Sequence, residues 1–212
     1  MNIVEVTYRW AKPLYRRSST AYIIIHHEAG NGQTPQSIHQ QHIAQGWAGI
    51  GYHYYIRKDG TIYRGRPENT IGTHCPSRNF DSIGVCFEGN FENETMGAAQ
   101  YNAGVSLLCD ILTRYPSAKI GKHKDFYATA CPGKNFPFAK MVADTEDENM
   151  TGEEIYTKFM EYAATLPESA WSVNGGSMAK AKAAGITDGT KPRAPLTREQ
   201  AMAILDRIGA IK

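Results

Sequence analysis

Three consecutive isoleucines lead directly into two histidines, and this run, from Tyr22 to His27, constrains the fold more than any other part of the chain. Apolar β-branched residues in a short continuous run predict a buried strand. Side chains alternate along a strand, so His26 and His27 must point to opposite faces of the sheet. The strand therefore carries one imidazole to each face at its end.

The elements around this strand alternate in type, which predicts a mixed α/β fold. Thr34-Pro35 is typical of a helix start, and Lys58-Asp59-Gly60 of a hairpin turn that joins antiparallel strands. We expect one mixed central β-sheet flanked by helices, with a small helical C-terminal segment. The predicted strands span residues 22–27, 52–57, 61–66 and 82–88, and the predicted helices 35–45, 95–115 and 136–142.

Uneven charge divides the 212-residue chain into three predicted parts. Residues 1–20 are predicted to be a basic N-terminal arm, because they hold four cations against one acidic residue, Glu5. Residues 21–150 are the main domain, and residues 151–212 a helical C-terminal segment. An acidic stretch over 144–154 is predicted to be a linker that opens into this segment. The four cations of the arm are Arg9, Lys12, Arg16 and Arg17.

Composition argues against two classes of partner. The net charge of +2 is too small to indicate nucleic-acid binding. No stretch approaches the roughly 18 apolar residues of a membrane span, and the first residues lack the apolar run of a signal peptide. We therefore expect cytoplasmic synthesis, with release by another agent if the substrate lies outside the cell. Among the four cysteines, Cys86 and Cys109 are interpreted as small buried residues, not disulfide partners.

Two histidines and one cysteine provide a candidate metal site. His26 ends the isoleucine strand, while His123 and Cys131 lie eight residues apart in HKDFYATACPG. Imidazole nitrogen and thiolate sulfur suit Zn²⁺. Three protein ligands leave a fourth tetrahedral position for water, which is typical of a catalytic zinc, whereas a structural zinc takes four protein ligands.

The segments around these residues extend the pattern. IIIHHEAG, GWAGIGYHYYIRKDGTIYRGRPENTIGTHC, SIGVCFEGN and HKDFYATACPG occur in that order. Together they resemble the zinc-dependent N-acetylmuramoyl-L-alanine amidases, which include phage lysozyme-type amidases and animal peptidoglycan-recognition proteins. The resemblance covers about residues 22–142. It implies zinc bound by His26, His123 and Cys131, and hydrolysis of the amide between the lactyl group of N-acetylmuramic acid and L-alanine in peptidoglycan.

The resemblance also assigns roles to three further residues. Tyr52, in the phrase Gly-Tyr-His, is expected to face the zinc and to hydrogen-bond the metal-bound water or the developing tetrahedral intermediate. Thr129 stands where phage enzymes usually have lysine and catalytic peptidoglycan-recognition proteins have threonine, so it can donate only a neutral hydrogen bond to an oxyanion. His74 matches a family histidine near the substrate groove and is expected to contact substrate. Packing is the alternative role for Tyr52 and His74.

Four other polar residues near these segments receive no catalytic role. His27, His39 and His42 are interpreted as structural, although the spacing of the last two on one helix could suggest a metal pair. Glu28 stays open between substrate contact and solvation.

The predicted function is that of a phage or prophage endolysin that acts on the cell wall after release. A bacterial autolysin or recycling amidase is the alternative among enzymes, and a non-catalytic peptidoglycan-binding protein the alternative outside them.

Teichoic acids or other anionic wall polymers are the predicted partners of the basic arm, with a solvated tail as the alternative. At the C-terminal end, AAGITDGTKPRAPLTREQ resembles half of a surface-layer-homology repeat, and Thr197 begins a capping box, which suggests possible cell-wall binding.

Overall fold

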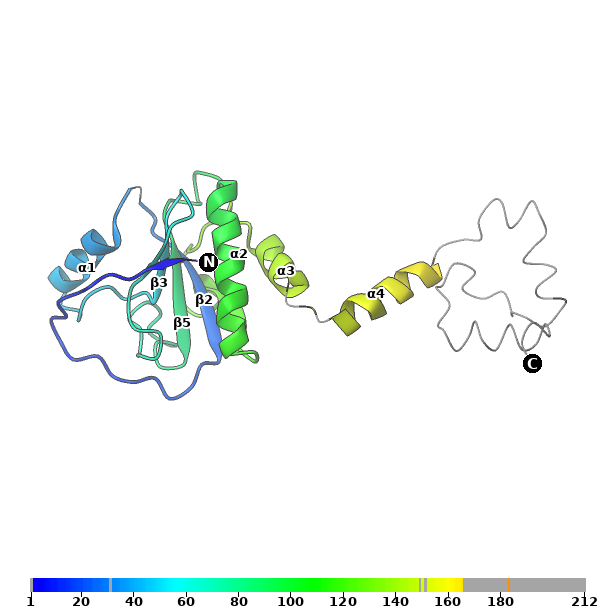
Figure 1. The fold of residues 1–212 in the computed structure, drawn as a ribbon. Helices are drawn as coiled ribbons and strands as arrows, with labels where there is room; N and C mark the ends of the chain where they lie inside the picture. Colours follow the sequence, from blue (N-terminus) through cyan, green and yellow to red (C-terminus); the bar gives the residue numbers. More distant parts are fainter. Residues whose placement is uncertain (1, 31, 149, 151, 166–182, 184–212) are drawn as a thin grey trace. The chain divides into compact units, whose positions relative to one another are not determined.

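A computed structural model of the chain describes residues 2–30, 32–148, 150, 152–165 and 183 (Figure 1). The chain falls into two compact units, Met1–Asn149 and Met150–Lys212. The first unit is a mixed six-stranded sheet with flanking helices, which confirms the predicted fold class. The half-repeat and the capping box at Thr197 lie outside the described residues.

The sheet has the strand order β1-β4-β3-β5-β2-β6. The successive pairs β3–β5, β5–β2 and β2–β6 are parallel, and the predicted hairpin supplies the antiparallel pair β3–β4. The strands are β1 (Ile3–Val4), β2 (Tyr22–His27), β3 (Tyr54–Ile56), β4 (Ile62–Arg64), β5 (Ser82–Phe87) and β6 (Lys119–Lys122). The helices are α1 (Pro35–Ala44), α2 (Ala98–Arg114), the 3-10 turn η1 (His123–Asp125), α3 (Phe138–Glu148) and α4 (Gly152–Thr165).

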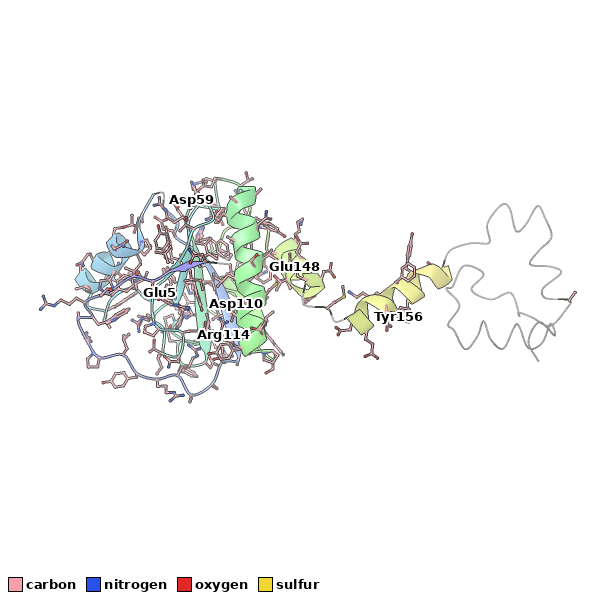
Figure 2. The ribbon with its side chains drawn as sticks, viewed as in Figure 1. Glu5, Asp59, Asp110, Arg114, Glu148 and Tyr156 are labelled. Atoms are coloured by element: carbon pink, nitrogen blue, oxygen red, sulfur yellow. The ribbon has the colours of Figure 1, made fainter. Side chains whose placement is uncertain are left out.

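Each face of the sheet has its own apolar cluster. Ile23 and Ile25 of β2 pack with α2 and α3 on one face, where Leu108 and Met141 join the cluster. On the other face, Ile38 of α1 packs with a smaller cluster around Ile50, Tyr55 and Cys86. α1 and α2 accordingly lie on opposite sides of the sheet in Figure 1. The solvent side of α2 is polar and includes the 2.8 Å ion pair between Asp110 and Arg114 (Figure 2).

Residues 3–17, part of the predicted basic arm, pack against the rest of the first unit. Strand β1 pairs with β4, and Tyr8 and Trp10 pack against the Ile38 cluster. Arg17 is only 6% exposed and donates a hydrogen bond to the carbonyl oxygen of Thr70 at 2.9 Å. Arg17 is therefore buried in the domain and cannot bind a wall polymer, which corrects the prediction for this cation.

Strand β6 is absent from the predicted elements. Its sequence, Lys-Ile-Gly-Lys, has one large apolar residue and so lacks the pattern of a buried strand. It lies at the edge of the sheet beside β2, and lysines are common on edge strands because they oppose pairing with another chain.

Two predicted boundaries differ from the structure. Helix α2 begins at Ala98, not Thr95, because the preceding residues form a turn in which the Glu94 carboxylate accepts a hydrogen bond from the backbone N–H of Asn90. Helix α3 continues to Glu148 and so includes half of the predicted acidic linker. Asp144, one of its acidic residues, accepts a hydrogen bond from the hydroxyl of Tyr101 of α2 at 2.7 Å.

Helix α4, which the sequence predicted, is the main described part of the second unit. Glu153 and Glu154 lie in its first turn, where the helix dipole favours acidic groups. Tyr156, labelled in Figure 2, Phe159 and Tyr162 are each more than half exposed. None of the described helices has the combination of length and apolar character needed to cross a membrane.

Candidate metal centre and active site

Strand β2 carries His26 to the carboxyl end of the parallel strands. His26 pairs in register with Cys86 of β5 and is 1% exposed. Because Ile23 and Ile25 face α2, alternation directs His26 to the face that α1 covers. His27 lies on the α2 face, where its Nδ1 accepts a hydrogen bond from the backbone N–H of Phe91 at 3.2 Å. This contact agrees with a structural role for His27.

The segment from His123 to Cys131 brings two further ligand atoms to His26. His123 begins η1 directly after β6, and β6 is the neighbour of β2. The backbone N–H of Lys124 donates to the carbonyl oxygen of Cys131 at 3.0 Å, which closes the segment on itself. The edge strand that the sequence did not predict is thus the element that places His123 beside His26.

One atom from each of His26, His123 and Cys131 could bind a common metal ion, because these atoms lie within 4.8 Å of one another. The Sγ of Cys131 is 3.8 Å from Nδ1 of His26, and the two imidazole ring centres are 4.3 Å apart. The Nε2 atom of His123 is buried and has no hydrogen-bond partner among the described residues. A buried polar atom without a partner is costly, so this atom fits a ligand of an ion.

Burial sets the protonation of these groups. It lowers the pKa of His26 well below its usual range, an effect that neighbouring His123 increases, and it also lowers the pKa of His123. Burial raises the pKa of the Cys131 thiol to about 12, although the backbone N–H of His27, 3.3 Å from Sγ, opposes this shift. A divalent cation would supply the charge that favours the thiolate, and neutral imidazoles are ready to bind it. The donor set therefore fits zinc.

Tyr52 and Thr129 both lie next to the ligand cluster. The ring centre of Tyr52 is 5.2 Å from that of His26. Burial raises the pKa of the Tyr52 phenol well above its usual value, and the neighbouring Cys86 and Cys131 raise it further, so the phenol stays protonated and can donate. The hydroxyl oxygen of Thr129 accepts a hydrogen bond from the backbone N–H of Cys131 at 3.3 Å.

His74 is buried next to His26. It is 7% exposed, and its Nδ1 lies 2.9 Å from Nε2 of His26. Its ring centre is 6.5 Å from that of Tyr52, so His74 belongs to the same cluster of rings as His26 and Tyr52. His74 therefore contacts a candidate ligand, and its predicted contact with substrate stays a prediction.

The helix histidines support the loop that leads to Tyr52. The Nδ1 atom of His39 accepts a hydrogen bond from Ile50 N–H at 3.1 Å, and Nδ1 of His42 accepts one from Gly51 N–H at 3.0 Å. Both rings thus hold backbone, as the sequence interpretation expected.

Two groups near the centre received no role from the sequence. Glu28 accepts a hydrogen bond from the hydroxyl of Tyr55 at 2.6 Å, while its other carboxylate oxygen is buried without a partner among the described residues. Tyr127 is 50% exposed, and its ring stacks on that of His123 at 5.6 Å. The only sequence signal for Tyr127 was its place between the two ligands, where an exposed aromatic residue could meet substrate.

Comparison with known families gives one match that includes all of these groups. Residues 16–134 match the N-acetylmuramoyl-L-alanine amidase family. The matched region contains the three candidate ligands together with Tyr52 and Thr129.

Individual relatives come from phages, bacteria and animals. The chain is 34% identical over 125 residues to the endolysin of Escherichia phage T7, and this match covers 55% of this chain and 83% of that protein. It is 36% identical over 127 residues to peptidoglycan-recognition protein SC2 of Drosophila melanogaster, covering 54% of this chain and 69% of that protein. The solved structure of the N-acetylmuramoyl-L-alanine amidase LysC from Clostridium intestinale URNW is 44% identical, with a TM-score of 0.68, and covers 69% of this chain and 98% of that chain.

Proposed function

Because the chain belongs to the N-acetylmuramoyl-L-alanine amidase family, we propose that it is a zinc-dependent hydrolase of the amide bond between N-acetylmuramic acid and L-alanine in peptidoglycan. The observation that carries the zinc dependence is the meeting of His26, His123 and Cys131, whose ligand atoms lie within 4.8 Å of one another. Peptidoglycan is accordingly the main partner of the protein.

The residues around the ligands would orient and stabilise the reacting amide. When bound, zinc supplies a Lewis acid for the carbonyl oxygen and lowers the pKa of a water molecule. The phenol of Tyr52, a protonated donor whose ring centre lies 5.2 Å from that of His26, would hydrogen-bond the oxyanion as charge develops on it. The Thr129 hydroxyl accepts from the backbone N–H of Cys131 and can donate its own hydrogen toward the substrate. Its donation is neutral, so we assign Thr129 the smaller share of the stabilisation.

Product analysis on purified cell walls tests this proposal. The enzyme should release free N-terminal alanine without new reducing sugar ends, because it cleaves an amide and no glycosidic bond. Cys131→Ser should abolish the release, whereas the control Cys109→Ser, on the α2 side of the sheet, should retain it. Walls that bind the parent protein but yield no alanine would instead indicate a non-catalytic peptidoglycan-binding protein.

We assign the enzyme to a phage or prophage, in which it would reach the wall after release from the cytoplasm. The resemblance to the T7 endolysin over 83% of that protein supports this role. Expression inside bacteria followed by permeabilisation of the membrane should lyse the culture, and Cys131→Ser should not. A recycling amidase would cleave soluble wall fragments but leave intact walls, and this result would overturn the lytic role.

We also propose that the C-terminal unit attaches the enzyme to walls. We assign this attachment to the exposed aromatic side chains of α4, at Tyr156, Phe159 and Tyr162. A chain that ends at Asn149, the last residue of the first unit, should keep alanine release from soluble fragments but pellet less with walls. Unchanged pelleting would show that the unit does not contribute to attachment.

A further inference from the structure

A row of hydrogen bonds leads from His26 into the interior of the protein. Nε2 of His26 lies 2.9 Å from Nδ1 of His74, and Nε2 of His74 lies 3.4 Å from the hydroxyl oxygen of Ser82. Ser82 in turn donates to the carbonyl oxygen of Arg78 at 2.5 Å. His74 and Ser82 are buried, at 7% and 0% exposure, so water does not compete for these contacts.

Two glycines make the space in which the His74 ring lies. A Cβ atom on Gly84 would lie 2.6 Å from the ring, and one on Gly72 would lie 2.4 Å from it. Gly84 is in the middle of β5, where glycine weakens a strand unless another group must approach closely. The sequence Ser-Ile-Gly-Val therefore contains both a hydrogen-bond partner and the space for this histidine.

The direction of the hydrogens follows from the far end of the row. A carbonyl oxygen can only accept, so the single O–H of Ser82 is donated to Arg78. The Ser82 oxygen must then accept from Nε2 of His74, although at 3.4 Å this is the weakest link. A neutral imidazole carries one N–H, so Nδ1 of His74 is an acceptor and Nε2 of His26 is its donor. This leaves the lone pair of His26 on Nδ1, the atom 3.8 Å from Cys131 Sγ.

We propose that His74 and Ser82 are positioning residues that fix the tautomer and ring orientation of His26 so that Nδ1 is presented to the metal. The inference rests on the proposed zinc site and adds the reason why one nitrogen of His26, and not the other, is the ligand. Metal-bound histidines commonly donate their second N–H to such a partner, and loss of that partner typically weakens metal binding about 10- to 100-fold.

The tautomers can be read directly by long-range proton–nitrogen NMR correlation on the full chain, before and after zinc is added. Both His26 and His74 should carry their hydrogen on Nε2 in the metal-free protein, and zinc should shift Nδ1 of His26. A hydrogen on Nδ1 of His26, or zinc bound through Nε2, would overturn the proposal while leaving the zinc site intact. The predicted tautomers without any zinc binding would overturn the zinc dependence and leave the hydrogen-bond row standing.

Zinc affinity, measured by competition with a chelating dye, tests the same residues in a second way. His74→Leu should bind zinc about 10- to 100-fold more weakly, and His74→Asn should recover much of the loss because its amide oxygen can accept from His26. Ser82→Ala is a smaller change that should also weaken zinc binding. It provides the test if His74→Leu fails to fold. The control His39→Asn changes a buried histidine whose ring nitrogens bond only backbone groups, and it should bind zinc like the parent. Parent-like affinity in folded His74→Leu or Ser82→Ala would refute the proposal.

Discussion

Replacing His53 with asparagine should make the free energy of unfolding less sensitive to acid. His53 is completely buried, and its Nδ1 accepts a hydrogen bond from Gly84 N–H at 3.0 Å. Its other ring nitrogen is 2.8 Å from the carbonyl oxygen of Thr70, to which it donates. Burial lowers the pKa of His53 from 6.5 to about 3, against the raising effect of the hydrogen bond to Thr70, so the folded protein keeps the ring neutral.

The magnitude follows from the two pKa values. Between pH 6.5 and pH 3 the unfolded chain binds a proton at His53 and the folded chain does not, so acid favours unfolding. The contribution of His53 to stability is present above pH 6.5 and is lost as the pH falls toward 3. Each pH unit in this window costs about 1.4 kcal/mol, so moving from pH 7.5 to pH 5.0 should cost about 2 kcal/mol from this group alone.

Urea denaturation of both proteins at pH 7.5 and pH 5.0, followed by tryptophan fluorescence, measures this cost. The asparagine side chain can accept from Gly84 in place of Nδ1, and any packing defect should weaken the variant similarly at both pH values. The other histidines titrate in both proteins, so the drop on acidification should be smaller in His53→Asn by about 2 kcal/mol. Equal drops in the two proteins would show that His53 is not held neutral by the fold.

Three further predictions concern the site and its surroundings. Cys131→Ala should bind less than one tenth of the zinc of the parent, as measured by elemental analysis, and should have no amidase activity; full activity in a metal-free parent would contradict zinc dependence. Tyr52→Phe should keep zinc and the fold but lose on the order of 10² in rate, while Thr129→Val should lose less, as measured by alanine release. Near-normal rates for Tyr52→Phe would mean that the phenol only packs. The double variant Arg9→Ala, Arg16→Ala removes two exposed cations and should pellet less than the parent with teichoic-acid-containing walls at low salt. This difference should disappear at about 1 M salt, where charges are screened beyond about 3 Å. Equal pelleting at low salt would show that these cations do not bind the wall.

The sequence predicted well those elements whose signal is local. The isoleucine run specified β2, and Thr34 followed by proline specified the start of α1, because both patterns act within a few residues. Strand β6 carries no such signal, since its pairing with β2 is decided by parallel contacts about a hundred positions away.

The same limit applies to the candidate site. Ligand types could be recognised from the chemistry of His26, His123 and Cys131, but the placement of His74 could not. The position of His74 next to His26 depends on the space left by Gly84 in strand β5. The spacing of residues along the chain does not encode this relation.

The distance along the chain between the ligands has a consequence for folding. His26 and Cys131 are 105 positions apart, and the four cysteines, all within the described residues, form no disulfide. A zinc ion bound by both residues would act as a cross-link that closes a long loop. In the chain-entropy model, a cross-link of that span lowers the entropy of the unfolded chain and so stabilises the fold by up to about 4.7 kcal/mol. Supply of the metal would then set not only how fast each molecule works but also what fraction of the molecules is folded.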